Sequence, residues 1–228
     1  MAAIPLQRDV YYPESDGKPM AETDLHRDEM IDLIKALDRR YRDELDVYVS
    51  GNLFFYYAKG DPRAVVAPDV FLVKGVEKRK RGTYKLWEEG RVPSLVIELT
   101  SDSSQDEDLS KKKPCYERLG IEEYFLHDPF QDYLDPALQG FRLVKGRYQP
   151  IAPEPDGSLH SRTTGLFLRT EGKRLRLVDA ATGEPLLWDE ERDVRLEQEQ
   201  AARRAAEERA DALQEELQRL RRELGRDS

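Results

Sequence analysis

Apolar residues recur at two spacings along the chain, and the change of spacing separates predicted helices from predicted strands. Over residues 23–42 they follow steps of three and four, and Thr23 is suited to cap the N-terminus, so we expect a helix there. A second helix is expected over 108–119, where Gly120 can end it. Continuous apolar runs typical of buried strands lie at 46–50, 53–58, 70–73, 94–99 and 123–126.

The order of these elements predicts an α/β fold, a mixed sheet flanked by helices. Gly51-Asn52 separates the first two apolar runs and is typical of a two-residue turn, so we expect residues 46–58 to form a β-hairpin. Short runs at 141–144 and 175–178 alternate with glycine and proline and predict a small β appendage. The expected organisation is a core over 1–136, a β appendage of the same domain over 137–188, and a helical tail over 189–228.

The tail is rich in charged residues and alanine and has an apolar seam with alternating steps of four and three. Such a seam is typical of a coiled coil and favours a partner helix, so we expect a homodimer formed through this helix. The alternative is a solvated single helix. The seam consists of Ala206, Ala210, Leu213, Leu217, Leu220 and Leu224.

Composition excludes several protein classes. The chain has 228 residues, one cysteine and a net charge of -9. A single cysteine excludes an internal disulfide framework, and no apolar run has the length of about 18 residues that a membrane helix needs. The first residues lack the apolar core of a signal peptide, so we expect a cytoplasmic protein that does not associate with membranes. The negative charge argues against a general nucleic-acid coat but leaves room for local basic patches.

Two carboxylates interrupt the apolar runs. Glu98 lies inside a stretch that is otherwise typical of a central strand, and Asp69 follows Pro68 and leads directly into the run at 70–73. Acids on neighbouring apolar strands predict a divalent-cation site, and oxygen ligands favour Mg²⁺ or Mn²⁺ over zinc. The alternatives are a buried salt bridge for Glu98 and a turn for Asp69.

Three successive lysines lie on the second predicted helix. Neighbouring residues of a helix point about 100° apart, so at most one or two of them can face the strand acids. Tyr116 is expected to face the sheet, and Lys112 lies four residues before it on the same face. Lys112 is therefore the predicted buried cation, whereas Lys111 and Lys113 are expected in solvent.

A basic loop follows the strand that Asp69 precedes. Because it leaves this strand directly, we expect it to contact DNA phosphates near the metal. The alternative is a solvated loop without a function. The predicted DNA-binding residues are Lys74, Lys78, Arg79, Lys80 and Arg81.

Several of these segments resemble the Uma2 family of restriction endonucleases, within the PD-(D/E)XK nuclease superfamily. The resemblance covers about residues 12–187 and rests on Pro-Asp-Val-Phe-Leu-Val at 68–73, Val-Ile-Glu-Leu-Thr-Ser at 96–101 and the segments 108–116 and 120–129. It implies a restriction-endonuclease-like core and metal-dependent cleavage of DNA.

The resemblance also implies roles for individual residues. Asp69 and Glu98 would be metal ligands together with the backbone carbonyl of Leu99, and Lys112 would be the catalytic lysine. Glu22 is similar to an acid that the superfamily places near its metals. His26, one turn later, is open to a functional or a packing role.

The chain departs from the superfamily pattern at Thr100, where the parent pattern has its lysine two residues after the glutamate. Two hypotheses therefore remain: a metal-dependent endonuclease, and a catalytically silent protein of the same fold that assembles through its tail. A carbohydrate or acyl hydrolase is a weaker third hypothesis, because the sequence has no nucleophile-elbow pattern.

Overall fold

The computed structural model describes residues 10–15, 23–100 and 108–224. The chain divides into two compact units, Met1–Leu186 and Leu187–Ser228, which are described separately. Glu22 lies outside the described residues.

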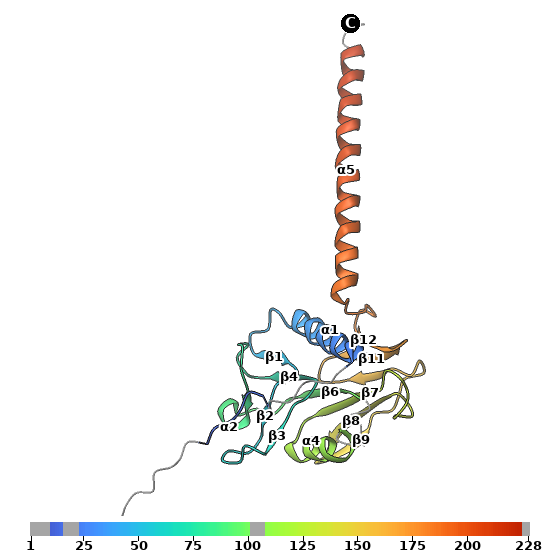
Figure 1. Cartoon of the computed structure of the whole chain (residues 1–228). Coiled ribbons are helices and arrows are strands. Elements are labelled where there is room, and N and C mark those ends of the chain that lie inside the picture. Colours follow the sequence, from blue (N-terminus) through green and yellow to red (C-terminus); the bar gives the residue numbers. More distant parts are fainter. Residues whose placement is uncertain (1–9, 16–22, 101–107, 225–228) are drawn as a thin grey trace, which may run out of the picture. The chain divides into compact units, whose positions relative to one another are not determined.

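A six-stranded mixed sheet forms the centre of the first unit among the described residues (Figure 1). β6 and β7 run parallel, and the other neighbouring strands of this sheet run antiparallel. The strand order is β1 (Val47–Ser50), β4 (Val70–Lys74), β6 (Leu95–Leu99), β7 (Glu123–His127), β8 (Leu138–Val144) and β9 (Arg147–Pro150). The predicted mixed sheet is confirmed.

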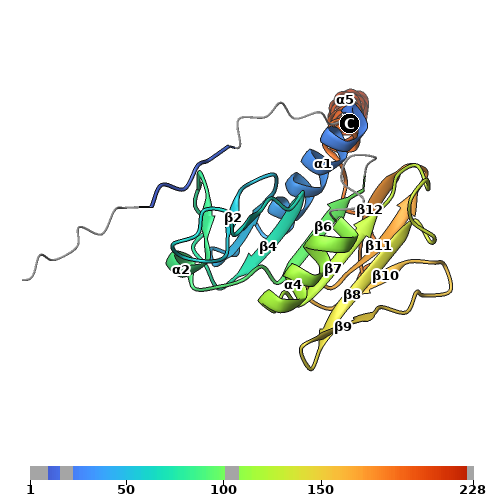
Figure 2. The same cartoon turned by 60° about the horizontal axis from the view of Figure 1, so that its bottom comes forward.

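Each face of this sheet carries its own apolar layer, as the two faces of a doubly covered sheet should. Leu33 and Leu37 of α1 (Asp24–Arg40) pack with Val70 and Ile97 on one face. On the other face, Tyr116 of α4 (Lys113–Leu119) packs with Val96 and its neighbours. Figure 2 shows α4 lying across the sheet beside β7.

The first helix begins as its capping residue predicts. The Thr23 side chain accepts a hydrogen bond from the backbone N–H of His26 at 3.2 Å. The helix ends at Arg40, two residues earlier than expected. Leu33 of this helix is buried, whereas Ile31 is 38% exposed.

The predicted hairpin at Gly51-Asn52 is wrong. β1 pairs with β4, whereas β2 (Phe55–Tyr56) belongs to a separate small sheet with β3 (Val65–Val66) and β5 (Tyr84–Lys85). Gly51 lies so close to the Asp69 backbone that a Cβ would approach the carbonyl oxygen to 1.9 Å. The glycine is therefore needed for close packing beneath Asp69, and not for a two-residue turn.

The boundary drawn for the β appendage is also corrected. β8 and β9 belong to the central sheet, and the third sheet consists of β10 (Leu159–Ser161), β11 (Leu166–Glu171) and β12 (Arg174–Asp179). Leu166 and Leu177 of this sheet share the apolar cluster of α1. These strands therefore complete the main core, because they cover apolar surface that α1 leaves open.

The second predicted helix forms in two parts. Asp108–Lys112 is a π-helical turn, and α4 continues from it with Pro114 in its first turn, where no N–H donor is needed. Gly120 ends the helix in the left-handed conformation at φ 85°, as predicted. A further short helix, α2 (Leu86–Glu89), follows β5.

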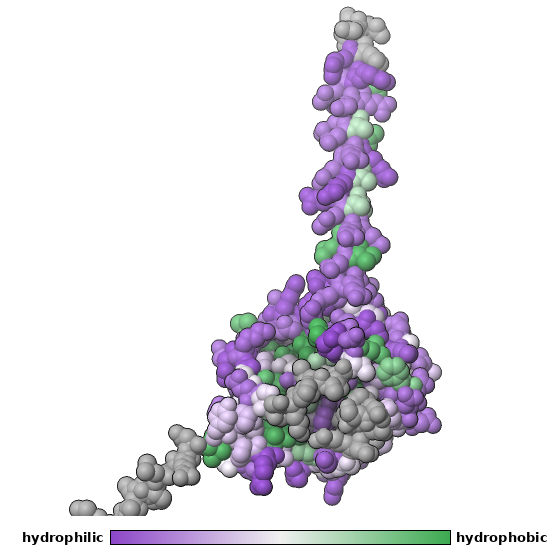
Figure 3. Space-filling view, viewed as in Figure 1, coloured by the Kyte–Doolittle hydropathy of each residue, from purple (hydrophilic) through white to green (hydrophobic). Residues whose placement is uncertain are grey.

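The second unit contains α5 (Asp189–Leu224), so the predicted tail helix forms. Leu213, Leu217 and Leu220 are 65%, 49% and 47% exposed, and Figure 3 shows apolar residues along α5 among hydrophilic ones. The helix thus carries the predicted seam on its surface. Over the described residues, a helix with the length and apolar character needed to cross a membrane does not occur.

Candidate active site

The ends of β4 and β6 bring the two predicted acids together. The antiparallel register pairs Val70 with Ile97, so Asp69 and Glu98 come next to each other just beyond that pair. The backbone N–H of Asp69 donates to Oε2 of Glu98 at 3.2 Å, and the N–H of Leu99 donates to Oδ2 of Asp69 at 2.8 Å. Each acid is therefore bonded to the strand that carries the other.

Lys112 supplies the positive charge that a buried carboxylate requires. Its Nζ lies 3.0 Å from Oε2 of Glu98, whose side chain is 0% exposed. Of the other two lysines, Lys111 is exposed and Lys113 lies over the ring of Phe141, with Nζ 3.4 Å from the ring centroid. The structure thus places Lys112 where the helical-face argument predicts and directs its neighbours elsewhere; Lys113, expected in solvent, is half-buried.

Tyr116 completes the surroundings of Glu98. Its hydroxyl donates to Oε1 of Glu98 at 2.6 Å. Burial, followed by the nearby charge of Glu98, raises the pKa of Tyr116 well above its ordinary value, so the hydroxyl stays protonated and remains a donor. The sequence pattern predicts only a packing role for Tyr116; its hydroxyl, four residues after Lys112, is the signal for a polar contact with Glu98.

His26 of α1 lies beside the other acid. Its Nε2 is 3.4 Å from Oδ1 of Asp69. Burial raises the pKa of Asp69, but hydrogen bonding to His26, the charge of Lys112 and the N–H of Leu99 outweigh it, so the net shift is downward. The lowered pKa favours the ionised carboxylate, which is the form that could bind a metal ion.

A buried acid of α1 escaped the sequence analysis. Glu29 is 2% exposed, its Oε1 lies 3.1 Å from Nδ1 of His127, and it accepts the N–H of Leu175 at 2.6 Å. Glu29 lies on the apolar face of α1, where its position among Met30 and Leu33 could have signalled burial. It ties α1 to β7 and β12.

The basic loop after β4 does not lie beside the paired acids, where the sequence predicts it. Asp69 precedes β4 and Lys74 ends it. The loop therefore begins at the other end of this strand, about 16 Å from Asp69 at the usual rise per residue. The expectation that this loop lies beside the acids is therefore wrong, because it took sequence adjacency for spatial adjacency.

Four of the five loop cations also have contacts within the protein. Lys74 donates to the carbonyl of Thr163, and Lys78 pairs with Asp38 at 2.9 Å. Arg79 and Arg81 both reach Oε1 of Glu89 at 2.7 Å. Lys80 is exposed.

The side chains present fit a hard divalent cation. Asp69 and Glu98 offer carboxylate oxygens at the sheet edge, with Leu99 beside them. Within the ranges that the structure describes, no group of three or more His, Cys, Asp or Glu side chains has the arrangement of a metal cage. Two carboxylates without such a cage suit Mg²⁺, which usually keeps several waters and binds one or two carboxylates.

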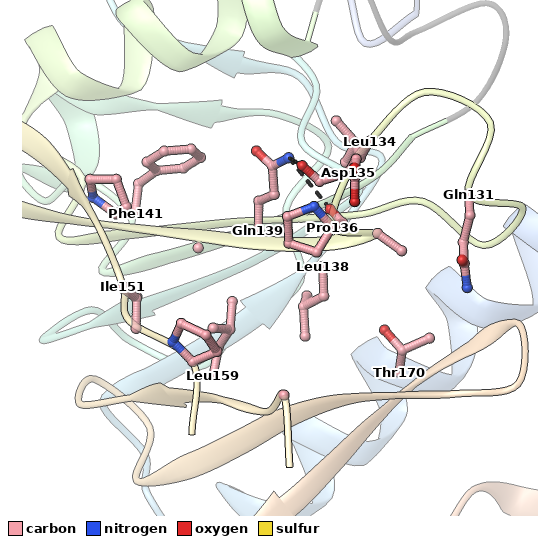
Figure 4. A pocket seen from close by; sticks show the side chains of 15 residues that line it. Gln131, Leu134, Asp135, Pro136, Leu138, Gln139, Phe141, Ile151, Leu159 and Thr170 are labelled. Atoms are coloured by element: carbon pink, nitrogen blue, oxygen red, sulfur yellow. Dashed lines mark hydrogen bonds between the residues drawn. The ribbon is translucent and has the colours of Figure 1, made fainter. Parts of the chain in front are cut away.

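A separate cavity of about 990 Å³ lies beside the start of β8 (Figure 4). Leu138, Gln139, Phe141 and Ile151 are among its lining residues, and the predicted site residues are not. It is therefore distinct from the paired acids.

The chain is similar to a solved structure and matches a family model. A crystal structure described as a putative nuclease belonging to DUF820, from Anabaena variabilis, is similar at 16% identity with a TM-score of 0.47, over 64% of this chain and 76% of that one. No curated protein matches the sequence. The family model described as "Uma2: Putative restriction endonuclease" matches residues 2–171, which is most of the chain. The chain therefore belongs to the Uma2 family of restriction-endonuclease-like proteins.

Proposed function

We propose that this protein is a metal-dependent endonuclease that hydrolyses DNA phosphodiester bonds with Asp69, Glu98 and Lys112. The observation that carries the proposal is the convergence of these residues: Lys112 Nζ and the Asp69 N–H both contact Oε2 of Glu98, at 3.0 and 3.2 Å. Family membership supports the choice of a nucleic acid as substrate.

In this proposal Asp69 and Glu98 hold Mg²⁺ or Mn²⁺, and the carbonyl of Leu99 is a further ligand. When bound, the ion lowers the pKa of a coordinated water and neutralises charge on the scissile phosphate. Lys112 orients the attacking water and stabilises the negative charge that develops on the phosphate during attack. His26 lies beside Asp69, with Nε2 3.4 Å from Oδ1, and favours the ionised form of this carboxylate.

We also propose that the protein acts as a homodimer paired through α5. The exposed leucines of the helix support this, because burying a narrow apolar seam against the seam of a second helix stabilises a coiled coil. Two copies would bring two sites to one duplex, which suits cleavage of both strands.

The test of the function is cleavage of supercoiled and linear DNA with Mg²⁺ or Mn²⁺. The parent protein should cut, and Asp69→Asn, Glu98→Gln and Lys112→Ala should each lose activity by orders of magnitude. Lys111→Ala is the matched control, because this exposed neighbour has the same charge and should leave cleavage intact.

A parent protein that cuts no DNA with either metal would favour the second candidate, a silent member of the fold that assembles through α5. The exposed apolar seam of α5 supports this second candidate, because such a seam can pair with another helix. Normal cleavage by Lys112→Ala would instead refute the role assigned to that lysine.

A further inference from the structure

Three exposed cations meet at the end of β4 that lies away from the paired acids. The Nζ of Lys74 donates to the carbonyl of Thr163 at 2.5 Å, so the preceding residue, Arg162, also lies at this end of the strand. Arg91 lies against the residue that follows Lys74, because a Cβ at Gly75 would be 3.5 Å from its Nε. The fold therefore brings together cations from three separate segments of the chain.

These cations are not neutralised by carboxylates. Among the described residues, the guanidinium groups of Arg91 and Arg162 have no ion pair, and the ammonium of Lys74 uses one of its three donors. By contrast, Arg79 and Arg81 of the basic loop share one carboxylate. The three cations are thus free to bind an anion.

The acids around them do not cancel their charge. Glu123 accepts the backbone N–H of Arg162, but its carboxylate pairs with Arg142 at 2.8 Å. Asp46 is exposed, and its backbone carbonyl accepts the N–H of Gly75 at 2.7 Å. Three positive charges therefore stand against one unpaired acid.

We propose that Lys74, Arg91 and Arg162 form a patch that binds the phosphates of duplex DNA. Lys74 lies about 16 Å from Asp69 at the usual rise per residue, so the patch holds DNA without touching the phosphate that is cleaved. The inference rests on the proposed function for the choice of DNA as the partner and goes beyond it in adding a second contact. Of the five cations that the sequence predicts to bind DNA, Lys74 alone belongs to this patch.

Duplex DNA suits these side chains. It carries one negative charge per about 1.7 Å of helix axis, and contacts to its phosphates require cations without a fixed geometry for reading bases. The arginine guanidinium can donate two parallel N–H groups to one phosphate. Because the chain has a net charge of -9, a local group of unpaired cations is needed to attract a polyanion.

The test is the binding of a fluorescent duplex, measured by anisotropy in EDTA so that no divalent cation takes part. Arg91→Gln combined with Arg162→Gln should weaken binding about tenfold at low salt. The slope of log affinity against log salt should become shallower by about 1.8, because each phosphate contact contributes about 0.9. Lys74 is left unchanged, since its bond to Thr163 also connects two segments.

Arg63→Gln combined with Arg147→Gln is the matched control. These arginines are 89% and 81% exposed, and each pairs with a carboxylate, at 3.1 and 2.9 Å. The control therefore removes the same charge from the surface but leaves the patch intact. Its affinity for the duplex should stay within twofold of that of the parent.

The results separate this inference from the proposed function. Unchanged affinity in the Arg91 and Arg162 double variant, or an equal loss in the control, would overturn the patch. A parent that binds no duplex, or that binds poly-glutamate more tightly than the duplex, would also overturn it, in the second case in favour of an acidic protein partner. A parent that cuts no DNA but loses duplex binding in the double variant would refute the proposed cleavage and keep the patch.

Discussion

Replacing Lys112 by methionine should destabilise the metal-free protein strongly, because it removes the cation and keeps most of the side-chain volume. At the 3.0 Å that separates Nζ from Oε2 of Glu98, the Coulomb attraction is about 5.5 kcal/mol at an effective dielectric constant of about 20. The side chain of Lys112 is only 13% exposed, so screening by solvent is small, but desolvation of both groups offsets part of the attraction.

Breaking a buried pair by removing one partner typically costs about 3–5 kcal/mol. Glu98 keeps two donors, the Asp69 N–H and the Tyr116 hydroxyl, so the cost should lie at the lower end of this range. We expect Lys112→Met to lower the free energy of unfolding by about 3 kcal/mol. Glu98→Gln in the same chain should recover much of this loss, because the double variant no longer buries an uncompensated charge. Urea unfolding at pH 7 measures both quantities.

Lys111→Met is the control for this experiment, since its exposed side chain should change the free energy of unfolding by less than about 0.5 kcal/mol. The reasoning would be refuted if Lys112→Met cost no more than this control, or if the double variant were as unstable as the sum of the two single variants.

The pKa of Asp69 is lowered in the folded protein, so its ionised form adds stability that is present above about pH 4 and is lost as the pH falls through the folded-state pKa. The free energy of unfolding of Asp69→Asn should therefore fall less between neutral and acid pH than that of the parent protein. Arg81→Ala should lower the melting temperature without changing DNA affinity, because the guanidinium of Arg81 pairs with Glu89. Lys80 is exposed, so if the loop contacts phosphate, Lys80→Ala should weaken DNA binding and make the affinity for DNA less dependent on salt. Leu217→Asp should reduce the mass measured by light scattering to that of a monomer; an unchanged mass in this variant would exclude pairing through α5.

The sequence indicated that Asp69, Glu98 and Lys112 lie together because the two acids interrupt apolar runs and the lysine shares a helical face with Tyr116. A carboxylate in an apolar strand must be compensated, and the helical period selected Lys112 over its two neighbours. These arguments need only residue type and spacing, so they hold before any tertiary contact is known.

The errors came from contacts that local patterns do not encode. Gly51 is small because Asp69 approaches it from another strand, and strands of two residues such as β2 and β5 give no periodic signal. The basic loop follows β4 in sequence, but β4 is extended, so the loop begins at the end of the strand that is far from Asp69. His26 and Glu29 acquire polar neighbours only when α1 packs on the sheet.

The reciprocal bonds of Asp69 and Glu98 have a consequence for the stability of the central sheet. The last residue pair of β4 and β6 is Val70 with Ile97. Beyond it, the side chains of Asp69 and Glu98 accept backbone N–H groups of the neighbouring segment and connect the ends of the two strands. Both acids therefore stabilise the fold, whether or not the protein cleaves DNA. Alanine at either position would remove these bonds, whereas Asp69→Asn and Glu98→Gln would keep an oxygen acceptor and remove only the charge. The amides are therefore the substitutions that separate a role of the charge from the role in the fold.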